Sequence, residues 1–169
     1  MTIKPLGFID TSTFAAMFLL GKAQKERTEN GVLRLRDIKD GEADASDLAI
    51  LKEWKSARAL LSRLRSAAAA YFDGVTPKLG RAWVEVLPPG VGTPWESEAG
   101  DYADNHVRTR TALVSNPGAV SYCGSAFAVL NIGWVNQVDH HQLCSELNIG
   151  DYPRVHLVVD VRIPDAAED

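Results

Sequence analysis

The chain has few cysteines, no long apolar run and no excess of positive charge, and each of these excludes a class of protein. Two cysteines, Cys123 and Cys144, in 169 residues are too few for a disulfide scaffold. Thirteen scattered glycines exclude a collagen-like repeat. The most apolar early stretch, 14–20, is about seven residues long, far below the roughly 20 that a membrane span requires.

The charge balance is slightly acidic. Eighteen basic side chains against 22 acidic ones give a net charge of −4, so the chain as a whole does not attract phosphate backbones or anionic lipid. We therefore expect neither a nucleic acid nor a membrane as a partner. The early residues lack a basic leading region and a small-residue cleavage site, which predicts no signal peptide. Together these features predict a cytoplasmic protein whose two cysteines are reduced.

The composition that remains is typical of a globular domain. Forty-six per cent of the residues are apolar and four are tryptophan, which excludes a disordered chain. The length is enough for one hydrophobic core and too short for two comfortable ones. We expect residues 1–169 to form a single domain.

Residues 1–75 carry helical signals. Side chains that favour an N-cap, Asp10 to Ser12, precede apolar residues at helical spacing up to Leu20, which predicts a short helix. A clearer helix is predicted from Ser46 or Asp47 toward Ala70, because its apolar residues fall three, four or seven apart. Those residues are Leu48, Leu51, Trp54, Leu61, Leu64 and Ala68. Residues 30–45, with two glycines and mixed charge, are typical of a loop.

From residue 81 the pattern changes to short β-prone runs separated by glycine and proline. The predicted strands are 82–87, 107–115, 126–132 and 156–161. Helices followed by strands indicate an α+β fold. We expect the N-terminal helices to pack on a sheet, barrel or sandwich formed by residues 81–165.

All four histidines lie in this β-rich half, and acidic residues accompany them. They are His106, His140, His141 and His156. Two histidines and one carboxylate on one face bind non-haem Fe(II) and leave the opposite face open to substrate and oxygen. A hydrogen-bonded or surface histidine is the alternative for each of them. For any single histidine in a strand, the second alternative is the more common one.

The segment 148–161 reads as a turn followed by an arginine that enters an apolar strand. On the inward face of a barrel, Arg154 would present a planar fork to a carboxylate. On a solvated face it would have no particular role. Both orientations stay open at this point.

Several motifs between residues 84 and 165 resemble the aspartyl/asparaginyl β-hydroxylase family, a branch of the 2-oxoglutarate and Fe(II)-dependent oxygenases. The most specific motif is Arg154-Val-His156-Leu-Val-Val-Asp160-Val, preceded by Asn148 and Gly150 and followed by Pro164-Asp165. The others are Leu87-Pro-Pro-Gly90, Arg108-Thr-Arg110-Thr-Ala-Leu113-Val-Ser-Asn116-Pro117 and Ile132-Gly133-Trp134-Val-Asn136.

The resemblance implies a double-stranded β-helix of the jelly-roll or cupin type that uses Fe(II) and 2-oxoglutarate. It implies that Arg154, with Arg108, binds 2-oxoglutarate, and that His140 or His141 is an iron ligand. The substrate would be a small molecule or a protein side chain, hydroxylated after oxidative decarboxylation of the keto acid. In this reading the protein holds the metal, orients the substrate and excludes water.

The chain departs from the family at the first metal motif. Where His-x-Asp is expected after the Pro-Gly turn, the sequence has Pro94-Trp95-Glu96-Ser97-Glu98. If Trp95 and Ser97 stand at the ligand positions, two iron ligands are missing, and a normal iron site would not form. Glu96, Glu98 and Asp101 are possible replacements. So are Asp104 and His106, which would share a face if 104–106 were a strand.

Two other functions therefore compete with a hydroxylase. A member of the fold that has lost its iron would serve as a binding or assembly module. A metal-independent barrel that binds a small carboxylate through Arg154 lies between the two.

Overall fold

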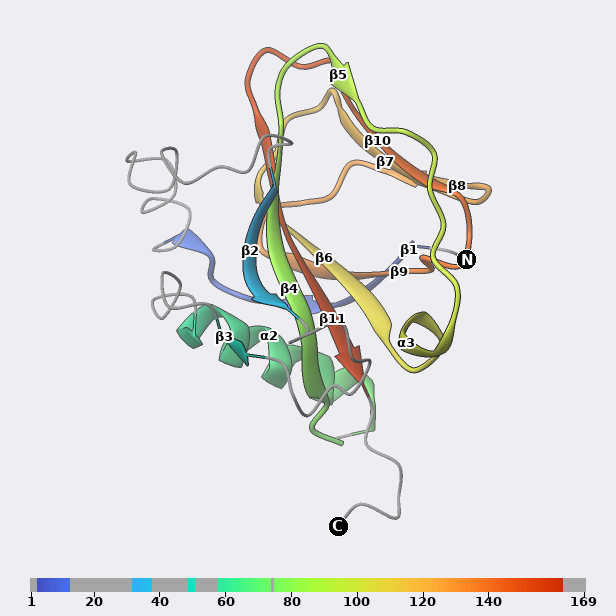
Figure 1. The fold of residues 1–169 in the computed structure, drawn as a ribbon. Coiled ribbons are helices and arrows are strands. Elements are labelled where there is room, and N and C mark those ends of the chain that lie inside the picture. Colours follow the sequence, from blue (N-terminus) through green and yellow to red (C-terminus); the bar gives the residue numbers. More distant parts are fainter. Residues whose placement is uncertain (1–2, 13–31, 38–48, 51–57, 74, 163–169) are drawn as a thin grey trace.

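The computed structural model describes residues 3–12, 32–37, 49–50, 58–73 and 75–162. In these residues the fold is mostly β-sheet, arranged as two antiparallel sheets (Figure 1). The larger has the strand order β1 (Ile3–Phe8), β9 (Trp134–Val138), β6 (Val107–Val114), β11 (Arg154–Arg162), β4 (Lys78–Leu87), β2 (Val32–Asp37) and β3 (Ala49–Ile50). The smaller has the order β5 (Val91–Gly92), β10 (Cys144–Asn148), β7 (Ala119–Cys123) and β8 (Ala126–Ala128). This architecture agrees with the predicted jelly-roll.

The central strand β11 is buried on both faces, and its sequence shows why. Val155, Leu157, Val159 and Val161 alternate with Arg154, His156, Val158 and Asp160, and all eight are buried. Because side chains alternate across a strand, the apolar set and the polar set point to opposite faces of the larger sheet. One face is a conventional hydrophobic core, and the other faces the smaller sheet.

The helix α2 (Arg58–Tyr71) covers the apolar face. Leu60, Leu61 and Leu64 join the same buried cluster as Val84 of β4 and Leu157 of β11. Leucines at positions i, i+1 and i+4 form one stripe of a helix, so α2 buries a single side against the sheet. A helix packed on the sheet was expected here.

The N-terminal part differs from its expected helical character. Residues 3–8 form the edge strand β1, and 32–37 form β2 within the segment expected to be a loop. The run Val32-Leu-Arg-Leu-Arg36 alternates apolar and basic residues, a period-two signal that the glycines and charges around it obscured. Residues 49–50 form β3 paired with β2, so the second helix does not begin at 46 or 47. Here sheet pairing overrides a helical spacing.

The first predicted helix falls mainly on 13–20, outside the described residues. Asp10 does accept hydrogen bonds from the amide and hydroxyl of Ser12, as an N-cap side chain would. Among the described residues, no helix has the length and apolar character to cross a membrane.

The C-terminal half follows the predicted strands more closely. The strands predicted at 82–87, 107–115 and 156–161 are confirmed as β4, β6 and β11. The strand predicted at 126–132 is only three residues long, β8, because the chain turns afterwards toward β9. Three further strands, β7, β9 and β10, carry too many polar residues to show a clear strand pattern in the sequence.

The two cysteines were expected to be reduced, and the structure joins them instead. Cys123 of β7 and Cys144 of β10 are directly opposite in the sheet register and form a disulfide, with their Cα atoms 4.0 Å apart. The sequence separation of 21 residues gave no indication of this pairing. The disulfide links two neighbouring strands of the smaller sheet.

Substitution of Leu157 tests the apolar core. This side chain is fully buried between the larger sheet and α2. We expect Leu157→Ala to lower the free energy of unfolding by about 2–5 kcal/mol, because the cavity loses both burial and packing. Urea unfolding followed by fluorescence measures the difference. Ile149→Ala, at a side chain that is 70% exposed, should change it by less than about 0.5 kcal/mol. Equal effects of the two substitutions would contradict this core.

Candidate binding site between the sheets

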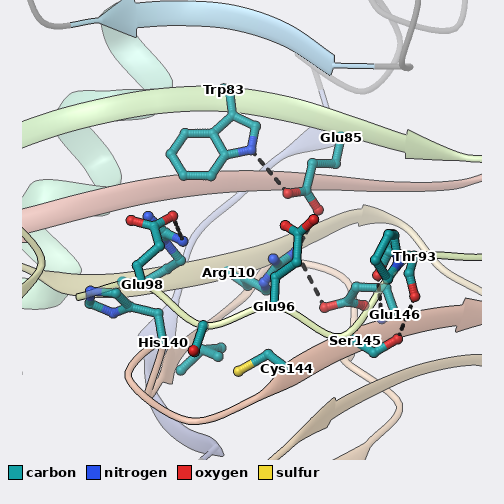
Figure 2. A pocket seen from close by; sticks show the side chains of 14 residues that line it. Trp83, Glu85, Thr93, Glu96, Glu98, Arg110, His140, Cys144, Ser145 and Glu146 are labelled. Carbon is teal, nitrogen blue, oxygen red and sulfur yellow. Dashed lines mark hydrogen bonds and ion pairs between the residues drawn. The ribbon is translucent and has the colours of Figure 1, made fainter. Parts of the chain in front are cut away.

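A cavity of about 370 Å³ lies between the two sheets (Figure 2). Its polar wall comes from β4, β6 and β10, and the segment that follows β5 closes another side. The lining residues are Trp83, Glu85, Thr93, Pro94, Glu96, Ser97, Glu98, Arg108, Arg110, Val138, His140, Cys144, Ser145 and Glu146. A volume of this order accommodates a small organic molecule.

Strand alternation directs the charged side chains inward. On β6, Arg108 and Arg110 are two residues apart and so share one face. On β4, Trp83 and Glu85 do the same, while Val84 between them packs on the opposite, apolar face. The polar face of the larger sheet is therefore built from β4, β6 and β11, and each of these strands places every second residue toward that face.

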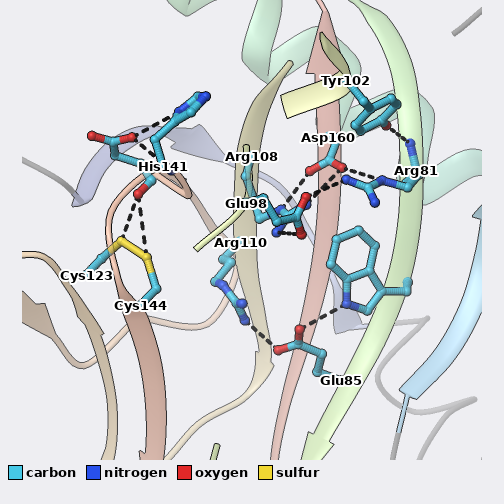
Figure 3. Close-up of polar contacts among 12 residues, drawn as sticks. Arg81, Glu85, Glu98, Tyr102, Arg108, Arg110, Cys123, His141, Cys144 and Asp160 are labelled. Atoms are coloured by element: carbon cyan, nitrogen blue, oxygen red, sulfur yellow. Dashed lines mark hydrogen bonds and ion pairs between the residues drawn. A yellow bond between two sulfur atoms is a disulfide. The ribbon is translucent and has the colours of Figure 1, made fainter. Parts of the chain in front are cut away.

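The first group of buried charges, here called the Asp160 cluster, contains Arg81, Glu98, Arg108 and Asp160. Arg108 donates Nε and one terminal nitrogen to the two oxygens of Asp160, at 2.8 and 3.1 Å. Its other terminal nitrogen donates to Glu98 at 2.7 Å. Arg81 also donates to both carboxylates, from Nε to Asp160 at 3.1 Å and from a terminal nitrogen to Glu98 at 2.7 Å (Figure 3). Two guanidinium groups thus neutralise two carboxylates.

The second group, the Glu85 cluster, contains Glu85, Arg110, Glu146 and Arg154. Arg154 is 1% exposed and donates to Glu146 at 2.6 Å, with Glu85 at 3.5 Å. Arg110 pairs with Glu85 and, at 3.3 Å, with Glu146. Arg154 therefore lies on the inward face of the fold, which decides between the two orientations left open by the sequence.

Trp83 connects the two clusters. Its indole nitrogen donates to Glu85 at 3.0 Å, and the guanidinium of Arg108 lies 4.8 Å from the centre of its ring. A guanidinium over an indole face is a favourable cation–π contact. The Asp160 cluster and the Glu85 cluster are thus parts of one continuous network, partly buried between the sheets.

The network keeps the carboxyl groups of Glu85 and Glu98 ionised. Burial by itself would raise the pKa of Glu85, but Arg110 and Arg154 outweigh it and lower this pKa from 4.5 to about 2. For Glu98, burial is likewise outweighed by hydrogen bonds and charge from Arg108 and Arg81, and its pKa is also about 2. Each ionised carboxylate depends on the arginines that face it.

Two histidines beside the network are held neutral. Burial, with the charges of Arg154 and Arg110, lowers the pKa of His156 well below 6.5. Arginine can only donate, so the 2.6 Å contact of Arg154 makes His156 Nδ1 an acceptor. His140 is 5% exposed, and burial followed by the charge of Arg108 lowers its pKa. His140 lines the cavity as an uncharged imidazole.

The four residues predicted as metal ligands do not converge. His140 lies in the cavity, but His141 is 43% exposed and contacts Asp104 at 3.2 Å on the surface. His106 is buried elsewhere, stacked on Tyr102 with its Nδ1 2.8 Å from the Tyr102 carbonyl. Within the described part of the chain, no three histidine, cysteine or acidic side chains form a group that would hold a metal ion.

The first metal motif adopts a different arrangement from the one expected. Trp95 is 56% exposed and packs outward on Tyr122, so it does not stand at an inward position. Glu96 and Glu98 point to the cavity side instead. Residues 101–104 form the short helix α3 (Asp101–Asp104), so Asp104 and His106 are not on one face of a strand as proposed.

Sequence reasoning missed Glu85, Glu146 and Trp83 as site residues. Both Glu85 and Trp83 lie in the strand predicted at 82–87. In Ala82-Trp-Val-Glu-Val86 each of them stands between two small or apolar residues. That period of two was the available signal. Glu146 lies in a strand with no clear pattern, so no signal pointed to it.

Acid should destabilise the protein in a defined order. The unfolded chain binds protons on histidine below about pH 6.5, whereas His156 stays neutral when folded, so stability declines from there. It falls more steeply between about pH 4.5 and 2, where the unfolded state protonates Glu85 and Glu98 first. Glu85 alone contributes up to about 3 kcal/mol above pH 4.5. We expect Glu85→Gln to flatten the lower part of the curve of unfolding free energy against pH, measured with urea. An unchanged slope would contradict the pairing.

Comparison with known proteins identifies the fold and nothing narrower. No protein-family model matches the chain, and no curated protein matches it. Solved structures do. AviO1 from Streptomyces viridochromogenes Tue57 matches with a TM-score of 0.63 and 14% identity, over 98% of this chain and 90% of that one.

Two further structures carry names that state their chemistry. The viral collagen prolyl hydroxylase vCPH from Paramecium Bursaria Chlorella virus-1, in a 2OG complex, has a TM-score of 0.61 and 8% identity, over 97% of each chain. An oxidoreductase of the 2OG-Fe(II) oxygenase family from Burkholderia pseudomallei has a TM-score of 0.61 and 13% identity, over 92% of this chain and 91% of that one. The narrower resemblance to aspartyl/asparaginyl β-hydroxylases is not shown by these matches. These matches show the fold alone, a jelly-roll that this chain shares with the solved structures named here.

Proposed function

We propose that this chain is a member of the oxygenase fold that binds a small molecule in its central cavity without iron chemistry. Of the functions that the sequence left open, this binding module agrees best with the side chains present. The observation that carries the proposal is the pairing of four arginines with four carboxylates between the sheets. Arg81, Arg108, Arg110 and Arg154 face Glu85, Glu98, Glu146 and Asp160.

The described residues do not fit Fe(II). An iron site needs imidazole and carboxylate groups whose lone pairs are free for the metal. His140 and Glu96 have free lone pairs, but no third such side chain joins them among the described residues. Both oxygens of Glu98 accept hydrogen bonds from arginine. The guanidinium of Arg108 lies between Glu98 and Asp160 and is close enough to His140 to lower its pKa. The positive charge of this guanidinium, held between the two carboxylates, would repel a divalent metal ion.

The arginine expected to bind 2-oxoglutarate is also occupied. Arg154 already pairs with Glu146 and Glu85, so the keto acid would have to displace a buried carboxylate. Arg108, the second residue expected to bind 2-oxoglutarate, is bound on both sides by Glu98 and Asp160. The same occupation disfavours a metal-independent site for a small carboxylate at Arg154. Removing one partner from a buried pair is strongly unfavourable, because it leaves the other charge alone.

A hydroxylase is the second candidate. The fold favours it, and so does His140, a neutral buried imidazole at the cavity wall. This candidate requires Arg108 and Glu98 to separate when metal binds. The two functions therefore differ in a spectroscopic property that is measured directly.

Anaerobic titration of the metal-stripped protein with Fe(II) and then 2-oxoglutarate separates the two candidates. A bidentate keto-acid complex of Fe(II) has a visible charge-transfer band. We expect no such band, because the residues that would bind both groups are paired with each other. Circular dichroism on the same sample checks that the protein is folded.

The two neighbouring histidines give a matched control. If the band forms in the original protein, is lost in His140→Ala and remains in His141→Ala, the hydroxylase is correct and the binding module is wrong. A band that persists in both variants would place the metal at neither histidine and would also contradict the binding module.

A further inference from the structure

The charges around the cavity do not cancel. The Asp160 cluster and the Glu85 cluster are each neutral, with two arginines and two carboxylates. Glu96 also lines the cavity, and its side chain makes no ion pair or hydrogen bond with another described residue. Figure 2 shows Glu96 among the labelled side chains of the cavity, between Glu98 and Glu146. The cavity and its direct partners therefore carry one uncompensated negative charge.

The position of Glu96 is fixed by its backbone. Its amide donates to the carbonyl of Cys144 at 2.9 Å, and the amide of Cys144 returns the bond at 2.8 Å. This bridge extends the smaller sheet by one residue pair. Trp95 packs outward on Tyr122, and alternation along an extended segment then turns Glu96 toward the cavity. The backbone of Glu96 is therefore held beside the cavity, and its exposed carboxylate has no partner among the described residues.

A second polar group in the cavity also lacks a partner. The ring of His140 is 5% exposed, lines the cavity and makes no hydrogen bond within the described residues. A neutral imidazole offers one lone pair and one N–H. The nitrogens of His140 are not among the fully buried atoms that lack a partner, so they are open to the cavity and available for a hydrogen bond with a ligand.

The arginines of the cavity do not favour an anionic ligand. Arg108, Arg110 and Arg154 already donate to carboxylates. The Nε atoms of Arg110 and Arg154 have no partner but are shielded from the cavity by burial. An anionic ligand would meet Glu96 without gaining a free cation.

Trp83, Pro94 and Val138 supply apolar surface to the same cavity. A bare metal ion would gain nothing from them, whereas a hydrocarbon group would be removed from water. Building on the proposed binding function, we infer that the cavity takes a small organic monocation, an amine with a hydrocarbon part, whose charge faces Glu96 and whose N–H group reaches His140.

A panel of compounds matched in shape and different in charge tests this inference. Two triplets serve as probes: phenethylamine, 2-phenylethanol and phenylacetate, and butylamine, butanol and butanoate. Binding to the full chain is measured by ligand-observed NMR in buffer with EDTA, so metal plays no part. We expect each amine to bind at least about fivefold more tightly than its alcohol, and the carboxylate to bind least. Added salt should reduce the difference.

Two matched variants locate the charge that selects the amine. Glu96→Gln should remove the preference for the amine and leave the protein folded, because the Glu96 side chain has no partner to lose. Asp151→Asn removes one exposed carboxylate away from the cavity and should leave the preference unchanged.

Three results would overturn the inference: equal binding of amine and alcohol, tightest binding of the carboxylate, or no binding by any probe. None of these results would support a hydroxylase, because the Fe(II) titration tests that function separately. A charge-transfer band in that titration would instead overturn the proposed function, whatever the panel shows.

Discussion

The structure depends on the pairing of buried charges between the two sheets. Arg154 and Asp160 are almost completely removed from water, on a strand that is also the centre of the hydrophobic core. Neither charge would be tolerated there alone. Arg108 from the neighbouring strand β6 compensates Asp160, and Glu146 from β10 in the smaller sheet compensates Arg154. Both the register of β6 on β11 and the packing of the two sheets must therefore be correct before these pairs form. Such a network specifies one arrangement of the sheets more than it adds stability.

The same pairing occupies side chains that the proposed function contrasts with an iron site. An oxygenase of this fold needs carboxylate and imidazole lone pairs directed at a metal, and an arginine free for a keto acid. Here Glu98 and Arg154 belong to internal ion pairs, whereas His140 and Glu96 line the cavity with side chains that have no partner among the described residues. The difference lies in a few side chains, which is why a fold alone does not assign an activity.

The network also explains why a cavity persists. Charged side chains held by several hydrogen bonds do not collapse into a neighbouring space as aliphatic ones do. Glu85 is fixed by Trp83 and Arg110, and Glu98 by two arginines. The walls of the cavity are therefore rigid and polar, whereas Glu96 at its side is free. A rigid wall with one unbalanced charge is suited to select a ligand by charge.

The sequence by itself determined the central strands and which side chains of a strand share a face, because a strand alternates with a period of two. The run from Arg154 to Val161 predicted a strand, and the fold class followed from such runs. Only the tertiary structure decided which charges meet. Glu85 and Glu146 are 61 residues apart and pair with the same two arginines, and Cys123 pairs with Cys144 through strand register. A local pattern shows whether a residue lies in a strand. Its ion-pair or disulfide partner depends on which strands and sheets lie next to each other in the folded protein.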